Sequence, residues 1–293
     1  MESIGSILVA LDRGAASRQT LLKAISVARR FGARLQLFLC DAERAYVLHH
    51  QYDVRAAGAV LKSAVGEAHE FLQNLWNSLA ADDVRVDFDA ASESPLCEAI
   101  VHKVRRSHPD LVIRAIGADG TGQGSTLTAT DFELVRTCQA PLLLTHGRPW
   151  SPTPQFAAAI DISGDEQPQL TQSVLHSADV FASHCGASLD LVYGAGDADA
   201  GRDAELRDAL RVRAQEVQAR TRALHVVGGD TARVLPEFIA AHGYDLVALG
   251  ALTHHKALTA LVGTFTGRLI ERADCDFLLV KLRTRRAAST HER

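Results

Sequence analysis

The feature that most constrains the fold is an internal repeat. Four segments recur in the same order in both halves: residues 7–12 (ILVALD) as 156–161 (FAAAID), 31–38 (FGARLQLF) as 185–192 (CGASLDLV), 109–112 (PDLV) as 244–247 (YDLV), and 138–144 (CQAPLLL) as 275–280 (CDFLLV). The offsets between paired segments run from about 135 to about 155 residues. Such a period is too long for a solenoid and indicates two copies of a whole domain.

The chain length and a cluster of glycine and proline residues agree with this division into two domains. A chain of 293 residues suits two domains. Gly147, Pro149, Pro152 and Pro154 interrupt regular structure between the copies. We therefore expect a first domain at residues 1–148 and a second at residues 155–283.

Each half alternates short apolar runs with longer amphipathic stretches. The runs predict buried strands at residues 7–11, 35–39, 111–113 and 142–144, and at 157–160, 189–192, 246–249 and 277–280, with a further strand at 84–88 and at 224–227. The 3.6-residue pattern predicts helices at residues 20–31, 59–79, 96–105, 202–222 and 234–242. Strands that alternate with helices imply an α/β fold with parallel strands.

One loop in the second half has the chemistry of an anion site. Gly250 ends a predicted strand, and Gly263 and Thr264 stand just before a helical run. A glycine lets the backbone approach a ligand closely. The N–H groups and dipole of a helix N-terminus favour a negative charge. Asp12 and Asp161 follow the first strand of each half and fall on the same edge of the sheet.

This segment resembles the signature of the universal stress protein family, G-x2-G-x9-G-[S/T], which wraps the phosphates of ATP in that family. Gly250 matches the first glycine, and Gly263-Thr264 matches the last pair at the family spacing. Residues 128–138 (TATDFELVRTC) resemble the degenerate first domain of the tandem, E-type branch.

The resemblance implies two tandem Rossmann-like domains of the adenine nucleotide alpha hydrolase-like kind. Each would have a five-stranded parallel sheet of order 3-2-1-4-5 flanked by helices. The two domains would pack as an intrachain pseudo-dimer in which the last strands meet, and a homodimer of whole chains stays open.

The resemblance also implies a binding set in the second domain alone, for ATP accompanied by Mg²⁺. The implied residues are Ala159, Asp161, Gly250, Thr253, Gly263, Thr264, Phe265 and Thr266. Asp161 would border the adenine and ribose, although a turn cap explains Asp12 and Asp161 equally well.

Thr253 departs from the pattern because it stands where the family has its second glycine. At a left-handed position its Cβ costs about 1–2 kcal/mol. In the first half, Thr126 stands near the place of the final glycine, and we expect no nucleotide there.

Three functions stay open: a nucleotide sensor for stress responses, an interaction scaffold without nucleotide, and a weak ATPase. No catalytic base, nucleophile or metal ligand set is identifiable, so an enzyme is the less favoured class.

The net charge of −4, with no basic run before the C-terminal tail, argues against a nucleic-acid partner. Five dispersed cysteines and the lack of a leader or an apolar span predict a cytoplasmic protein without a membrane partner.

Overall fold

The computed structural model describes residues 3–43, 45–46, 54–118, 126–162, 168–196, 199, 201–251 and 267–282. The first half comprises β1 (Ser6–Leu11), α1 (Ser17–Phe31), β2 (Arg34–Cys40), α3 (Val54–Asn77), β3 (Val86–Ala91), α4 (Leu96–Ser107), β4 (Leu111–Ala115), α5 (Ala129–Thr137) and β5 (Leu142–Thr145). The second comprises β6 (Gln155–Ala159), α6 (Pro168–Cys185), β7 (Ser188–Ala195), α7 (Asp203–Glu216), β8 (Ala223–Gly228), α8 (Thr231–His242), β9 (Leu246–Gly250), α10 (Gly267–Arg272) and β10 (Asp276–Val280).

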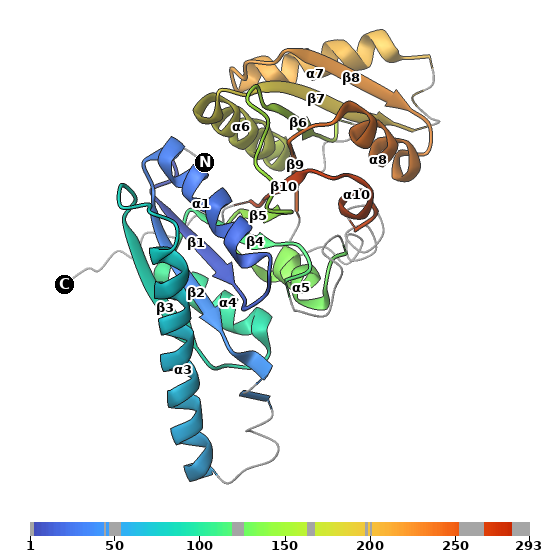
Figure 1. The fold of residues 1–293 in the computed structure, drawn as a ribbon. Coiled ribbons are helices and arrows are strands. Elements are labelled where there is room, and N and C mark those ends of the chain that lie inside the picture. The colour runs from blue at the N-terminus through green and yellow to red at the C-terminus, as the bar shows by residue number, and fades with distance from the viewer. Residues whose placement is uncertain are drawn as a thin grey trace, which may run out of the picture.

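All ten strands form one continuous sheet of order β3-β2-β1-β4-β5-β10-β9-β6-β7-β8 (Figure 1). Every pairing within a half is parallel, and the halves join through the antiparallel pair of β5 and β10, where Leu144 faces Phe277. The α/β fold expected from the sequence is confirmed, but the two expected sheets are a single sheet. The join removes two apolar edges that would otherwise be exposed to pairing with other chains.

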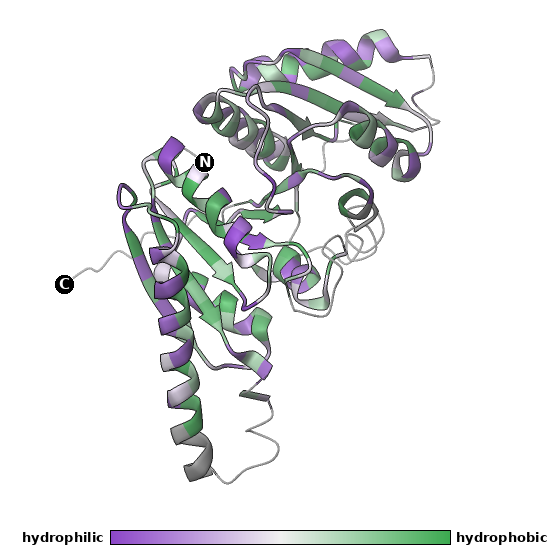
Figure 2. Ribbon diagram, in the orientation of Figure 1, coloured by the Kyte–Doolittle hydropathy of each residue, from purple (hydrophilic) through white to green (hydrophobic). Residues whose placement is uncertain are grey.

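The strands near the middle of the sheet are buried on both faces, because helices cover both faces. β1, β4, β5 and β10 are buried at every residue, as a parallel sheet between two helical layers requires. One core lies under α1, α3, α6 and α7, and the other lies under α4, α5, α8 and α10. Both cores contain residues from both halves. Figure 2 shows the strands mainly hydrophobic and the helices mixed.

Some predicted boundaries are wrong for local reasons. The helix expected at residues 202–222 ends at Glu216, because Gln218 adopts a positive φ of 55°. The chain beyond it then enters strand pairing, where the Arg222 N–H donates to the Leu189 carbonyl. Helix α6 was given no range from the sequence, although Pro168 suits the first turn of a helix and Leu175, Ala178 and Phe181 are buried.

A buried ion pair lies between the halves. The Lys23 ammonium of α1 is 2.8 Å from Asp276 Oδ2 of β10, and both side chains are at most 4% exposed. Asp276 also accepts hydrogen bonds from Thr145 Oγ1 at 2.8 Å and from Trp150 Nε1 at 2.8 Å. The ammonium lies 4.2 Å from the centre of the Trp150 ring. The carboxylate therefore ties together α1, β5 and the segment that connects the halves.

Two further features bear on the sequence expectations. None of the helices in the described ranges has the length and apolarity needed to cross a bilayer. All five cysteines are free thiols, and Cys138, Cys185 and Cys275 are buried.

Candidate functional site

The predicted binding edge lies where the strand order of the second half reverses. β6 is flanked by β7 on one side and β9 on the other, although β9 comes last of the three in the sequence. Crossovers that leave a central strand in opposite directions open a crevice at its carboxyl end, where open α/β sheets bind ligands. Ala159 is the last residue of β6, Asp161 follows it, and Gly250 ends the adjacent β9.

The structure therefore brings together three of the predicted site residues: Ala159, Asp161 and Gly250. Thr253, Gly263, Thr264, Phe265 and Thr266 lie outside the described residues. Asp161 is exposed, and its backbone carbonyl accepts a hydrogen bond from Thr171 Oγ1 at 3.1 Å. That bond ties the strand end to the first turns of α6.

Gly250 has a packing role in addition to its predicted binding role. A Cβ at this position would lie 2.8 Å from Leu170 Cδ2, which is closer than van der Waals contact allows. Leu170, in the first turn of α6, thus rests against the glycine backbone. A ligand that reaches the Gly250 backbone from this side has to displace a flexible leucine tip.

At the corresponding edge of the first half, the carboxylate of Asp12 is hydrogen-bonded within its own turn. Asp12 Oδ1 accepts hydrogen bonds from the Gly14 N–H at 2.9 Å and from Ser17 Oγ at 2.7 Å. Asp12 therefore holds the turn that leads into α1, which is the capping role considered for it from the sequence.

Sequence reasoning missed a buried ion pair beside this edge. Arg114, on β4, donates from Nε to Asp131 Oδ1 at 2.9 Å, and both side chains are 0% exposed. Asp131 Oδ2 also accepts from the backbone N–H groups of Gly117 at 3.1 Å and Thr128 at 3.0 Å. The Thr128-x-x-Asp131 capping box was the available signal.

This carboxylate lies at the helix start that corresponds, in the repeat, to the predicted phosphate position of the second half. Asp131 lies in the first turn of α5, and α10 is the repeat's counterpart of α5. The helix N-terminus that would hold a phosphate in a complete motif here holds a carboxylate of the same chain. The first half thus carries its own anion, together with a guanidinium that neutralises it.

The second half has a different buried acid on β7. Asp190 is 1% exposed and accepts from Arg222 Nη2 at 2.6 Å, His225 Nε2 at 3.2 Å and Tyr244 Oη at 3.0 Å. Burial pushes the pKa of Asp190 upward, but the hydrogen bonds from Arg222, His225 and Tyr244 outweigh it and leave the pKa below its ordinary value. His225, Phe238 and His242 pack ring against ring beside it.

We expect Asp190→Asn to lower stability at neutral pH by about 1–3 kcal/mol, because hydrogen bonds to a charged group are lost. A carboxylate whose pKa is lowered on folding stabilises the protein above its unfolded pKa of about 4, and this stabilisation is lost as the pH falls through the folded pKa. The difference between variant and wild type should therefore shrink below about pH 4. Urea unfolding across pH, with Asp208→Asn on the exposed face of α7 as control, tests this. A difference independent of pH would contradict it.

No three His, Cys, Asp or Glu side chains among the described residues gather closely enough to hold a metal ion.

A model of the universal stress protein family matches residues 115–281, which is more than half of the chain. The chain therefore belongs to the universal stress protein family. It is 19% identical over 300 residues to universal stress protein E of Escherichia coli K12, a match that covers 94% of this chain and 93% of that protein. It is 17% identical over 301 residues to universal stress protein E of Photorhabdus laumondii, with 96% of each chain covered.

Solved structures share the fold over nearly the whole length. A functionally unknown protein from Pseudomonas aeruginosa PAO1 is 20% identical with a TM-score of 0.73, covering 96% of this chain and 94% of that one. A universal stress protein from Archaeoglobus fulgidus is 14% identical with a TM-score of 0.67, covering 95% and 97%. These likenesses extend over both halves and agree with the tandem arrangement.

Proposed function

We propose that this universal stress protein is a cytoplasmic nucleotide sensor whose second half binds one adenine nucleotide, ATP with Mg²⁺. The binding residues would be Ala159, Asp161 and Gly250 together with Thr253, Gly263, Thr264, Phe265 and Thr266. The observation that carries the proposal is the position of Asp161 and Gly250 on adjacent strand ends at the reversal of strand order. Asp161 would face the ribose, and the loop would wrap the phosphates.

Features of the first half support the proposal that each chain has only one nucleotide site, in the second half. Its helix N-terminus is occupied by Asp131, and its Asp12 is engaged in a turn. An incoming phosphate would meet a carboxylate and be repelled. Calorimetry with ATP should therefore give at most one site per chain, and two equivalent sites would refute this part of the proposal.

We expect Thr253→Gly to strengthen ATP binding roughly tenfold if residue 253 takes the left-handed conformation of a glycine, since removing the Cβ then recovers about 1–2 kcal/mol. The greater chain entropy of glycine, about 0.5–1 kcal/mol, trims the gain. Titration calorimetry of wild type and variant at fixed Mg²⁺ measures it. Thr153→Gly, exposed in the segment that connects the halves, is the control for a general effect of glycine. Unchanged affinity in Thr253→Gly would mean that Thr253 is not the obstacle.

A scaffold without nucleotide is the second candidate. It is favoured by the contact of Leu170 with Gly250, which covers one side of the glycine. This candidate predicts no melting shift of wild type or Thr253→Gly with any adenine nucleotide. A weak ATPase would instead release phosphate steadily and lose that activity in Gly263→Asp.

A further inference from the structure

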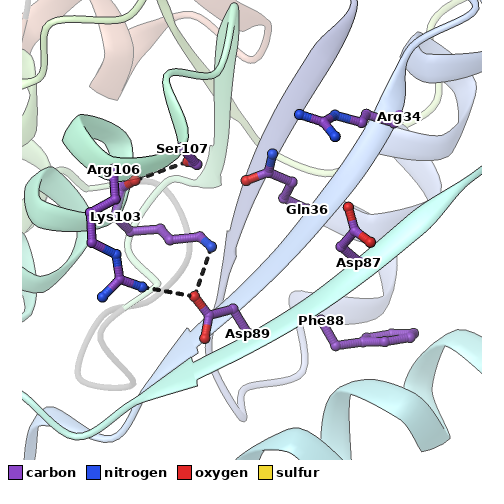
Figure 3. A pocket seen from close by; sticks show the side chains of 8 residues that line it. All are labelled: Arg34, Gln36, Asp87, Phe88, Asp89, Lys103, Arg106 and Ser107. Atoms are coloured by element: carbon purple, nitrogen blue, oxygen red, sulfur yellow. Dashed lines mark hydrogen bonds and ion pairs between the residues drawn. The ribbon is translucent and has the colours of Figure 1, made fainter.

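An open depression in the first half, beside β2, β3 and α4, is lined mainly by charged side chains (Figure 3). Asp89 is paired there with Lys103 at 2.7 Å and with Arg106 at 3.3 Å. Exposed charges that are met by one another or by water give a ligand little to bind. The predicted nucleotide edge of the second half is different, because an apolar side chain lies across it.

That side chain is Leu170. It belongs to the first turn of α6, the helix that follows β6, yet its tip rests on Gly250 at the end of the neighbouring strand β9. A Cβ on Gly250 would lie 2.8 Å from Leu170 Cδ2 and 2.9 Å from Leu170 Cγ. The leucine lies flat on the backbone only because residue 250 has no side chain. One side chain therefore reaches from the helix after β6 to the end of β9, the two strands that form the predicted nucleotide edge.

Leu170 is held in this position from two sides. It is half-buried and packs against the core that lies under α6. The next residue, Thr171, donates from Oγ1 to the carbonyl of Asp161 at 3.1 Å and so fixes the first turn of α6 to the end of β6. A ligand that displaces Leu170 moves an apolar group from the core into water, which is unfavourable in proportion to the area exposed.

The first half has a small residue in the place of this leucine. Ser17 Oγ donates to the carbonyl of Asp12 at 2.7 Å, which is the counterpart of the bond from Thr171. The residues just before the two hydroxyls are therefore equivalent, and Ala16 corresponds to Leu170. Ala16 is exposed to solvent. Its methyl group is too short to do what the leucine does in the second half.

The strand residue differs between the halves in the opposite sense. The repeated segments at residues 109–112 and 244–247 make Ala115 the counterpart of Gly250. The first half thus has a Cβ on the strand and only a methyl group on the helix. The second half has no Cβ on the strand and an isobutyl group on the helix. A large apolar side chain at this edge is therefore a property of the second half, and the shared fold does not require it.

We propose that Leu170 is a specificity-determining residue of the nucleotide site, which lowers the affinity for ligands whose phosphates pass over Gly250. This inference rests on the function proposed above. Adenosine, bound beside Asp161, leaves the leucine in place. ATP has to turn the leucine away before its phosphates reach the backbone at Gly250, so the wild-type site discriminates against the phosphate chain.

Leu170→Ala should lower the Kd for ATP about fivefold, because no apolar side chain then has to leave the core, and it should leave the Kd for adenosine unchanged. Calorimetry of the full chain with both ligands, at fixed Mg²⁺, measures the two constants. Leu22→Ala, which removes an exposed leucine from α1, is the control and should bind both ligands like wild type. An equal Kd for ATP in wild type and Leu170→Ala, or an equal gain for adenosine, would overturn the proposal.

Melting temperatures keep this result separate from the nucleotide proposal. Gly250→Ala should lower the Tm of the wild-type chain, because the new Cβ meets Leu170, and should lower it much less in the Leu170→Ala background. Equal lowering in both backgrounds would mean that Leu170 does not cover Gly250, and the inference would fail even if ATP binds. If the contact is confirmed but wild type, Leu170→Ala and Thr253→Gly all fail to bind ATP, the nucleotide function itself is wrong, and the role of Leu170 in specificity falls with it.

Discussion

Lys23→Met is expected to destabilise the chain by about 3–5 kcal/mol, because it leaves the carboxylate of Asp276 buried without a counter-charge. Methionine keeps most of the side-chain volume, so the loss reports the charge rather than a hole. Burial lowers the pKa of Lys23, and the carboxylate of Asp276 opposes that effect. The hydrogen bonds from Thr145 and Trp150 would remain in the variant, but they do not neutralise a charge.

Urea unfolding followed by tryptophan fluorescence measures the loss, because the Trp150 ring lies against both members of the pair. The matched control is Arg148→Met. Arg148 also reaches across to the second half, to Asp274, but both side chains are more than half exposed. Exposed pairs contribute about 0–1 kcal/mol. Equal losses in the two variants would show that the buried pair does not hold the halves together.

The order of strands and helices was predictable from the sequence, because buried strands have a recognisable apolar pattern. Strands such as β1 and β4 lie between two helical layers and must be apolar throughout, so they stand out as short unbroken runs. The joining of β5 to β10 depends on contacts between residues more than 130 apart in the chain, and only the family resemblance indicated it. Helix α7 was predicted too long because Gln218 adopts a positive φ, and glutamine is not a residue that signals such a helix end in the sequence.

The candidate site was predictable only in part. Asp161 and Gly250 were found because strand ends in a repeat fall on one edge of the sheet, which is a matter of topology. The Arg114–Asp131 pair depends on side chains that meet across elements. The capping box of Thr128 and Asp131 marks only the start of a helix, and no local pattern pairs Asp131 with Arg114 on a distant strand.

Asp131→Ala is expected to destabilise the chain by about 3–5 kcal/mol, because it removes the carboxylate that is paired with the buried guanidinium of Arg114. It also removes the acceptor for the N–H groups of Gly117 and Thr128. The alanine leaves a gap of about the size of a carboxylate, lined by the donors that held Asp131. If the first half is closed to ligands by its own anion, this gap becomes an anion site.

Formate should therefore restore stability to Asp131→Ala. A ligand that binds only the folded state at about ten times its Kd adds about 1.4 kcal/mol. Wild type should gain nothing, because its carboxylate already occupies the place. Asp131→Asn is the sharper control, since it removes the charge but fills the gap, and formate should leave its melting temperature unchanged. Equal stabilisation of all three proteins by formate would be a general salt effect, and it would remove the ground for treating Asp131 as a built-in substitute for a bound anion.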